Sequence, residues 1–144
     1  MSNMVIGWGG SVFAQNERLN NLFGVPAPDN VLVEVIPTPP GEESSLKFLD
    51  KDYWFDPMLL KKLLRWIYGD SHRNNILLIG DAGVGKSSVI LETAARLGVP
   101  VFQLACSGKT RFQHLVGSRE LVNGETRWKD GPLTRAMREG GIML

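Results

Sequence analysis

The chain has 144 residues, of which 43% are hydrophobic and 22% charged, and its formal net charge is +1. That length suffices for a globular core, and no apolar run approaches the roughly 18 residues that a membrane span needs. The N-terminus lacks the basic and apolar regions of a secretory signal, and the single cysteine excludes an internal disulfide framework. We therefore expect a cytoplasmic protein with no membrane partner.

The charge is unevenly distributed along the chain. Residues 29–56 carry seven acidic and two basic side chains, whereas residues 57–144 carry thirteen basic and seven acidic ones. A basic part suits an anionic ligand, and the acidic segment could dock on it, although two ordinary solvated surfaces explain the same pattern. The basic excess is too small to predict nucleic-acid binding.

Residues 1–55 predict an irregular, proline-rich N-terminal arm. Five of the eight prolines lie between Val25 and Gly41, around the apolar run VLVEVI at residues 31–36. Proline at this density disfavours long helices and central strands, so we expect at most one edge strand here. We place the second domain at residues 56–144.

An amphipathic helix is predicted after Asp56. Asp56 is a favourable N-cap, Pro57 suits the first helical position, and Gly69 is a natural end. The apolar side chains recur every three or four positions and predict one buried face. They are Leu59, Leu60, Leu63, Leu64 and Ile67.

The next segment predicts a strand, a loop, a helix and a second strand. The run ILLI at residues 76–79 suits a strand that is buried on both faces. A helix is expected over residues 86–97, followed by a strand at residues 101–105 and a short helix that ends near Leu115. This order is typical of an α/β fold.

The loop between the first strand and the helix carries the chemistry. Gly80-Asp81-Ala82-Gly83-Val84-Gly85-Lys86-Ser87 fits the phosphate-loop pattern G-x-x-x-x-G-K-[ST]. We expect positive φ at its three glycines, so that successive N–H groups face one anion. The helix N-terminus adds further donors and a partial positive charge.

These residues predict binding of a nucleoside triphosphate, namely ATP with Mg²⁺. Lys86 would reach the β- and γ-phosphates, and the hydroxyl of Ser87 would ligate the Mg²⁺ ion. The expected nucleotide-binding residues are Gly80, Asp81, Ala82, Gly83, Val84, Gly85, Lys86, Ser87 and Ser88. The similar run Ser107-Gly108-Lys109-Thr110 has no glycine-rich lead-in, and we expect a turn there instead.

Residues 76–144 resemble the front half of an AAA+ ATPase. They are most similar to the MoxR and cobaltochelatase CobS group of the helix-2-insert clade, within the dynein-related AAA subfamily. The runs that carry the resemblance are LLIGDAGVGKSS at 77–88, RLGVPVFQLACSG at 96–108, LVGSREL at 115–121 and WKDGPLTRAMREGGIML at 128–144. The N-terminal arm is similar only through FGVPAP at 23–28 and YWFDP at 53–57.

The resemblance implies a P-loop NTPase fold, a three-layer αβα core with strand order 5-1-4-3-2. It also implies a remodelling ATPase that works as a homo-oligomeric ring, a hexamer, and that can pair with a von Willebrand A-domain protein. A non-motor nucleotide-binding module and a subunit of a nucleic-acid translocase remain as alternative functions.

A β-hairpin is predicted around Asn123-Gly124, a favourable type I′ turn with strand-like residues on both sides. In the related proteins such hairpins contact the substrate, which implies that Arg127, Trp128 and Lys129 are candidate substrate contacts. The alternative is a surface ribbon in which Trp128 packs onto the body of the domain.

The last residues predict a helix after Pro132 and a third strand that begins at Ile142. By the resemblance this is the Walker B strand, which should be followed by an Asp that holds Mg²⁺ and a catalytic Glu. Neither follows in this sequence, so we assign no catalytic residue and expect no ATP hydrolysis by this chain alone. We expect a fragment in which the strand at residues 76–79 has no neighbour to pair with.

Overall fold

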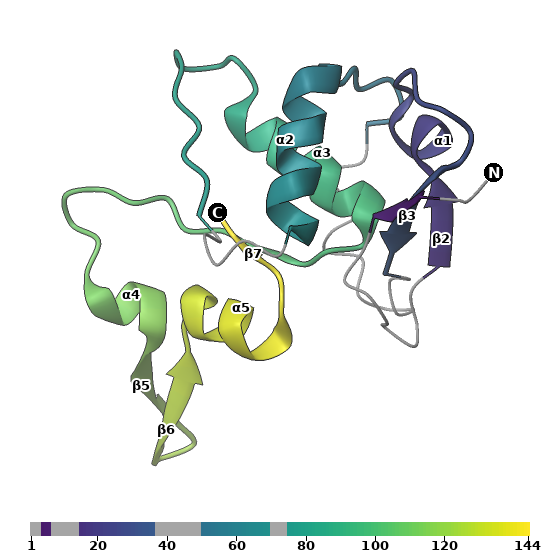
Figure 1. The fold of residues 1–144 in the computed structure, drawn as a ribbon. Coiled ribbons are helices and arrows are strands. Elements are labelled where there is room, and N and C mark those ends of the chain that lie inside the picture. Colours follow the sequence, from purple (N-terminus) through teal and green to yellow (C-terminus); the bar gives the residue numbers. More distant parts are fainter. Residues whose placement is uncertain (1–3, 7–14, 37–49, 70–74) are drawn as a thin grey trace. The chain divides into compact units, whose positions relative to one another are not determined.

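A computed structural model describes residues 4–6, 15–36, 50–69 and 75–144 (Figure 1). The chain forms two compact units, Met1–Gly98 and Val99–Leu144, and each is described by itself. The sequence pattern placed a boundary at residues 55/56, whereas the structure groups residues 50–69 with the N-terminal strands. Among the described residues, no helix combines the length and apolar character that crossing a bilayer would require.

The N-terminal unit begins with a three-stranded sheet. Its strands are β1 (Met4–Ile6), β2 (Gln15–Arg18) and β3 (Val31–Val35), in the order β1-β3-β2. Strand β3 runs parallel to β1 and antiparallel to β2. The short helix α1 (Leu19–Phe23) lies between β2 and β3 and ends at Gly24, whose φ is +65°.

The prediction of an edge strand at residues 31–36 was therefore wrong, because β3 has a neighbour on each side. None of the five residues of β3 is a proline, so all of its N–H groups remain available for pairing. The prolines precede or follow the strand, and those at 37, 39 and 40 lie outside the described residues. The arm thus has regular elements at residues 15–23 and 31–35, joined by a loop.

Two helices form the rest of the N-terminal unit. Helix α2 (Pro57–Tyr68) begins at Asp56, whose carboxylate accepts a hydrogen bond of 2.7 Å from the N–H of Leu59. Helix α3 (Lys86–Leu97) ends at Gly98, which caps the C-terminus of the helix in a left-handed conformation with a φ of +69°. Both predicted helices are confirmed, and Leu60, Leu63 and Leu64 of α2 are buried as expected.

Residues before Asp56 help to form the core around these helices. The hydroxyl of Tyr68 donates to the carbonyl of Glu34 at 2.5 Å, and the N–H of Ile36 donates to the carbonyl of Leu97 at 2.9 Å. The first bond joins α2 to β3, and the second joins the residue after β3 to the end of α3. The buried apolar side chains are Leu19, Phe23, Val25, Val33, Phe55, Leu60, Leu63, Leu64, Tyr68, Val89, Ile90, Ala94, Ala95 and Leu97.

A buried ion pair fixes residues 50–55 on α3. The carboxylate of Glu92, which is 5% exposed, pairs with Arg96 and accepts from the N–H of Asp50 at 2.9 Å. Arg96 also donates to the carbonyl of Asp50 at 2.7 Å, and its guanidinium lies 4.9 Å from the centre of the Phe55 ring. Because both charges are paired and hydrogen-bonded, their burial is tolerated.

Residues 75–81 are irregular, so the strand predicted at residues 76–79 is not formed. Leu77 is 81% exposed and Ile79 is 86% exposed. A strand needs a neighbour to satisfy its N–H and C=O groups, and no described strand pairs with this segment. The apolar run at residues 76–79 predicted a buried strand, but its side chains are largely exposed to solvent.

The C-terminal unit contains a parallel pair of strands, β4 (Val101–Phe102) and β7 (Ile142–Met143). The hydrogen bond from the N–H of Leu104 to the carbonyl of Leu144, 2.8 Å long, extends this pairing beyond β4. The predicted strands are confirmed, although β4 is shorter than residues 101–105. Helix α5 (Pro132–Glu139) precedes β7, and Phe102, Ala136 and Ile142 form the small core.

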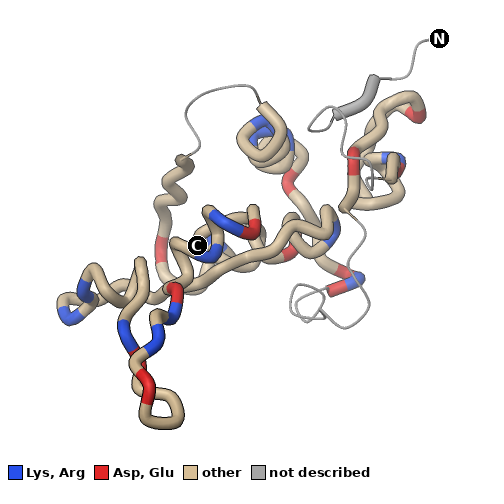
Figure 2. The backbone as a smooth tube through the Cα atoms, turned by 90° about the horizontal axis from the view of Figure 1, so that it is seen from below, with Lys and Arg blue, Asp and Glu red and all other residues tan. Residues whose placement is uncertain are grey.

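A hairpin follows the short helix α4 (Phe112–Val116). Its strands are β5 (Gly117–Val122) and β6 (Glu125–Asp130), which are antiparallel. Asn123 and Gly124 have φ values of +53° and +82°, as a type I′ turn requires, so the predicted hairpin is confirmed. Acidic and basic residues both occur along this hairpin, as the red and blue segments of the backbone tube show (Figure 2).

Candidate nucleotide-binding site

The candidate site is the loop before α3 together with the first turn of that helix. Gly83 and Gly85 have φ values of +82° and +84°, which L-residues rarely adopt, and a Cβ atom at either position would meet no other atom within 4 Å. These two glycines are therefore needed for their backbone conformation, not for space. The sequence prediction holds at both positions.

Gly80 does not behave like the other two glycines, because its φ lies outside the positive region. A Cβ atom at residue 80 would meet a methyl carbon of Val84 at 3.4 Å, which is an ordinary contact. The expectation of positive φ at all three glycines was therefore wrong for Gly80.

The N–H groups at the start of α3 are available to a ligand. The N-cap residue is Gly85, which has no side chain to accept a hydrogen bond from the first N–H groups of the helix. Residues 82 and 83 form a turn. Among the described residues, the N–H groups of Gly83 and of residues 85–88 have no hydrogen-bond partner, and the helix ladder begins with Val89 donating to the carbonyl of Gly85 at 3.0 Å. Several N–H donors in sequence, next to the positive end of a twelve-residue helix, are an arrangement that suits an anion.

Lys86 folds back over the beginning of the loop. Its Nζ atom donates to the carbonyl of Gly80 at 2.9 Å and to the carbonyl of Asp81 at 2.6 Å. The two hydrogen bonds thus hold the Lys86 side chain on the loop that also carries the N–H donors. Residues 81–84 are exposed, so an anion in solvent can reach both the backbone donors and the ammonium group.

The site fits a polyphosphate better than it fits a metal ion held by protein alone. Ser87 is exposed in the first turn of α3, and its hydroxyl is one oxygen ligand that could complete the shell of a nucleotide-bound Mg²⁺. Within the described ranges, no group of three or more His, Cys, Asp or Glu side chains could hold a metal ion.

All of the residues predicted from Gly80 to Ser88 belong to this one segment of the N-terminal unit. Sequence analysis did not predict that the carbonyls of Gly80 and Asp81 accept from Lys86. Backbone acceptors leave no trace in residue identity, so no signal in the sequence could have indicated them.

The other lysine that follows a glycine lies in a different structure. Residues 107–110 form a turn in which the N–H of Thr110 donates to the carbonyl of Ser107 at 3.0 Å. The N–H of Ser107 donates in return to the hydroxyl of Thr110 at 2.8 Å. This confirms the turn predicted at Ser107–Thr110 and distinguishes it from the phosphate loop.

The three candidate substrate contacts lie on β6, in the C-terminal unit. Trp128 is 56% exposed, so within its own unit it does not pack onto a core. Arg127 pairs with Glu125 at 2.9 Å, and Lys129 pairs with Glu120 at 3.0 Å.

Comparison with known proteins gives a consistent assignment for one part of the chain. Residues 75–144 match the family model described as AAA domain (dynein-related subfamily). Protein NorQ of Paracoccus denitrificans is 48% identical over 67 residues, which cover 46% of this chain and 25% of NorQ. The denitrification regulatory protein NirQ of Stutzerimonas stutzeri is 43% identical over 72 residues, which cover 49% of this chain and 26% of NirQ.

A more distant match extends further along this chain. The von Willebrand factor A domain-containing protein 8 of Mus musculus is 31% identical over 94 residues, which cover 65% of this chain but 5% of the mouse protein. The chain spans about a quarter of the length of NorQ and NirQ.

Proposed function

Residues 75–144 belong to the dynein-related subfamily of AAA domains, and from this premise we propose that the loop at residues 80–87 binds MgATP. The observation that carries the proposal is the position of Lys86. Its ammonium group bonds to the carbonyls of Gly80 and Asp81, beside the unbonded N–H groups of the same loop. A polyphosphate meets a positive side chain, backbone donors and a helix N-terminus in this one place.

Each residue has a distinct role in the proposed complex. The N–H groups of Gly83 and of residues 85–88 contact phosphate oxygens. Lys86 exchanges hydrogen bonds to the carbonyls of Gly80 and Asp81 for contacts with the terminal phosphates. Ser87 supplies the hydroxyl ligand to Mg²⁺. The positive φ values of Gly83 and Gly85 keep the backbone donors directed to a single anion.

We propose for the intact protein the role that its family membership supports. It is a homo-oligomeric, ring-forming ATPase that remodels a partner protein, and a von Willebrand A domain is the proposed partner. The support is the NorQ and NirQ matches and the name of the mouse relative. For residues 1–144 the proposal concerns nucleotide binding, which the contacts of Lys86 in the loop at residues 80–87 support.

A non-motor nucleotide-binding module is the second candidate function. The observation that favours it is that Ser87 is the one Mg²⁺ ligand proposed in the loop, with no described acidic cluster to assist it. Phosphate release by the intact protein separates the two candidates, since a motor turns over ATP and a binding module does not.

The test of the proposal is binding of a fluorescent ATP analogue in the presence of Mg²⁺ to the chain and to two lysine variants. Lys86→Ala removes a charge-assisted hydrogen bond worth about 1.5–3 kcal/mol, so we expect at least a roughly tenfold weaker affinity. Lys109→Ala is the matched control, because Lys109 also follows a glycine but is exposed and lies in a turn. Equal affinity for Lys86→Ala and the parent would refute the assignment.

A further inference from the structure

The strand alternation of the hairpin separates its side chains into two groups. On one side of the hairpin Gly117 faces Asp130, Arg119 faces Trp128 and Leu121 faces Thr126, and these six residues are called the tryptophan face. Ser118 faces Lys129, Glu120 faces Arg127 and Val122 faces Glu125, and these six are called the ion-pair face. Directly opposite residues in an antiparallel pair project from the same side of the sheet, and successive residues project from opposite sides. Trp128 is therefore on the other side from its neighbours Arg127 and Lys129.

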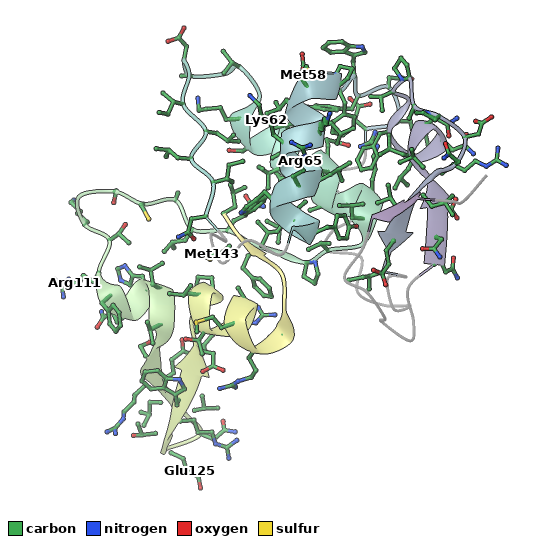
Figure 3. The ribbon with its side chains drawn as sticks, in the orientation of Figure 1. Met58, Lys62, Arg65, Arg111, Glu125 and Met143 are labelled. Carbon is green, nitrogen blue, oxygen red and sulfur yellow. The ribbon has the colours of Figure 1, made fainter. Side chains whose placement is uncertain are left out.

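The cations of the ion-pair face already have partners. Lys129 pairs with Glu120 across the strands at 3.0 Å, and Arg127 pairs with Glu125 at 2.9 Å, next to the turn. In Figure 3 the labelled Glu125 lies at the tip of the hairpin. Because each basic side chain is neutralised within the hairpin, this face offers little net attraction to a charged partner.

The tryptophan face has the opposite character. Leu121 is 75% exposed and Trp128 is 56% exposed, so the face presents apolar surface that its own unit does not cover. The indole N–H of Trp128 donates to a carboxylate oxygen of Asp130 at 2.8 Å, which fixes the orientation of the ring. Arg119 is exposed and makes no ion pair with any residue of the described chain.

The charges of the C-terminal unit explain why Arg119 has no ion-pair partner among the residues that the structure describes. Residues 99–144 carry seven basic and four acidic side chains. The four acidic residues are all in ion pairs with a basic residue of the same unit. Three cations are left over, and they are Lys109, Arg111 and Arg119. Lys109 and Arg111 lie just before α4, and Arg119 lies on β5, so Arg119 is the unpaired cation that the hairpin itself carries.

We propose that the tryptophan face binds an extended, acidic polypeptide segment of a partner protein. An exposed indole and leucine with a guanidinium group beside them match a segment in which carboxylates and apolar side chains are mixed. Arg binds a carboxylate through two parallel hydrogen bonds, which adds specificity to attraction. A nucleic acid fits less well, because its affinity depends on many phosphate contacts and only three cations of this unit lack an ion-pair partner among the described residues.

This inference rests on the proposed function, because it specifies the substrate class for the hairpin of a protein-remodelling ATPase. It also revises the candidate contacts on β6. Trp128 remains a contact residue, Arg119 and Leu121 join it from β5, and Arg127 and Lys129 belong to the opposite face.

The test measures fluorescence anisotropy of a dye-labelled peptide built from Glu, Leu and Ser, with the full chain and without nucleotide. We expect Arg119→Glu to weaken binding at least about tenfold, because a favourable charge pair becomes a repulsive one. Arg127→Glu is the matched control, since it makes the same charge change on the ion-pair face. It should change the affinity less than about threefold.

Further variants and probes keep the inference falsifiable. Trp128→Ala should also lose about tenfold in affinity, with the circular dichroism spectrum unchanged. Equal losses from Arg119→Glu and Arg127→Glu would overturn the proposal, since net charge alone would then explain binding. No binding of the acidic peptide would also overturn it, as would tighter binding of a single-stranded oligonucleotide. Failure of ATP-analogue binding alone would refute the proposed function and leave this peptide measurement unaffected.

Discussion

The Nζ atom of Lys86 lies 2.9 Å from the carbonyl oxygen of Gly80, six residues earlier in the chain. This bond joins the start of the loop to the first residue of α3. A phosphate group that binds here must therefore compete with backbone carbonyls for the ammonium group of Lys86. The hydrogen bonds that the phosphate gains from the unbonded N–H groups of the loop offset this competition.

The first prediction concerns the glycines of the loop. Gly85→Ala forces a non-glycine residue to a φ of +84°, which costs roughly 1–2 kcal/mol if the loop keeps its shape. We expect ATP-analogue affinity to fall about five- to thirtyfold, because the variant must recover that conformation on binding. Isothermal calorimetry with MgATP measures the change.

Gly80→Ala is the matched control for that prediction. The new Cβ atom has a 3.4 Å contact with Val84 and no strained φ, so its affinity should stay close to that of the parent. If Gly80→Ala and Gly85→Ala weaken binding equally, backbone conformation is not the reason for the glycine at residue 85.

The second prediction concerns Gly98, where α3 meets the residue after β3. A Cβ atom at this position would overlap the backbone carbonyl of Ile36, and the φ of +69° adds strain. Gly98→Ala should therefore lower the free energy of unfolding by more than about 2 kcal/mol. Urea denaturation followed by circular dichroism gives this quantity. Gly108→Ala, which meets no atom within 4 Å, should change it by less than about 0.5 kcal/mol.

The third prediction concerns the start of α2. The carboxylate of Asp56 accepts from the N–H of Leu59 at 2.7 Å, so Asp56→Ala should destabilise the N-terminal unit by about 1 kcal/mol. Asp56→Asn keeps an acceptor oxygen and should recover most of the loss. Thermal unfolding of the two variants measures the difference, and equal melting temperatures for both would contradict the role of the cap.

The fourth prediction concerns alkaline pH. Burial, and secondarily the negative charge of Glu34, raise the pKa of the Tyr68 hydroxyl well above its ordinary value. Above about pH 10 the unfolded chain loses this proton while the folded chain retains it, so stability falls as the pH rises. Denaturant titrations at a series of alkaline pH values follow this loss.

Tyr68→Phe tests the assignment of that pH dependence. The variant loses the hydrogen bond to the carbonyl of Glu34, which should lower stability at neutral pH by about 1 kcal/mol. It should also have a shallower decline of stability at alkaline pH. Some decline should remain, because burial, together with the charge of Glu92, raises the pKa of Tyr53 as well. An unchanged alkaline slope in Tyr68→Phe would be inconsistent with this account.

The features that the sequence predicted correctly depend on local signals. Helix α3 spans Lys86–Leu97 as expected, since the phosphate-loop pattern marks its start and Gly98 marks its end. The hairpin turn needs only Asn and Gly at adjacent positions, which tolerate positive φ at low cost. The phosphate-loop pattern at residues 80–87 is contiguous as well, and its binding of a phosphate stays a prediction.

The features that the sequence did not predict depend on distant neighbours. Residues 31–35 have two partner strands that their own composition does not indicate, and the surrounding prolines suggested an edge. Residues 76–79 have the composition of a buried strand, but a strand also needs a second backbone to pair with. Likewise, the separation of Trp128 from Arg127 and Lys129 follows from strand register, which residue identity alone did not reveal.

The uncovered side chains of Leu77 and Ile79 have a consequence for the protein in solution. A segment with exposed aliphatic side chains and unpaired backbone groups favours aggregation between molecules. We expect light scattering by the purified polypeptide to rise with concentration, and Leu77→Lys to keep it clear at higher concentrations. A variant that clouds as readily as the parent would show that another surface limits solubility.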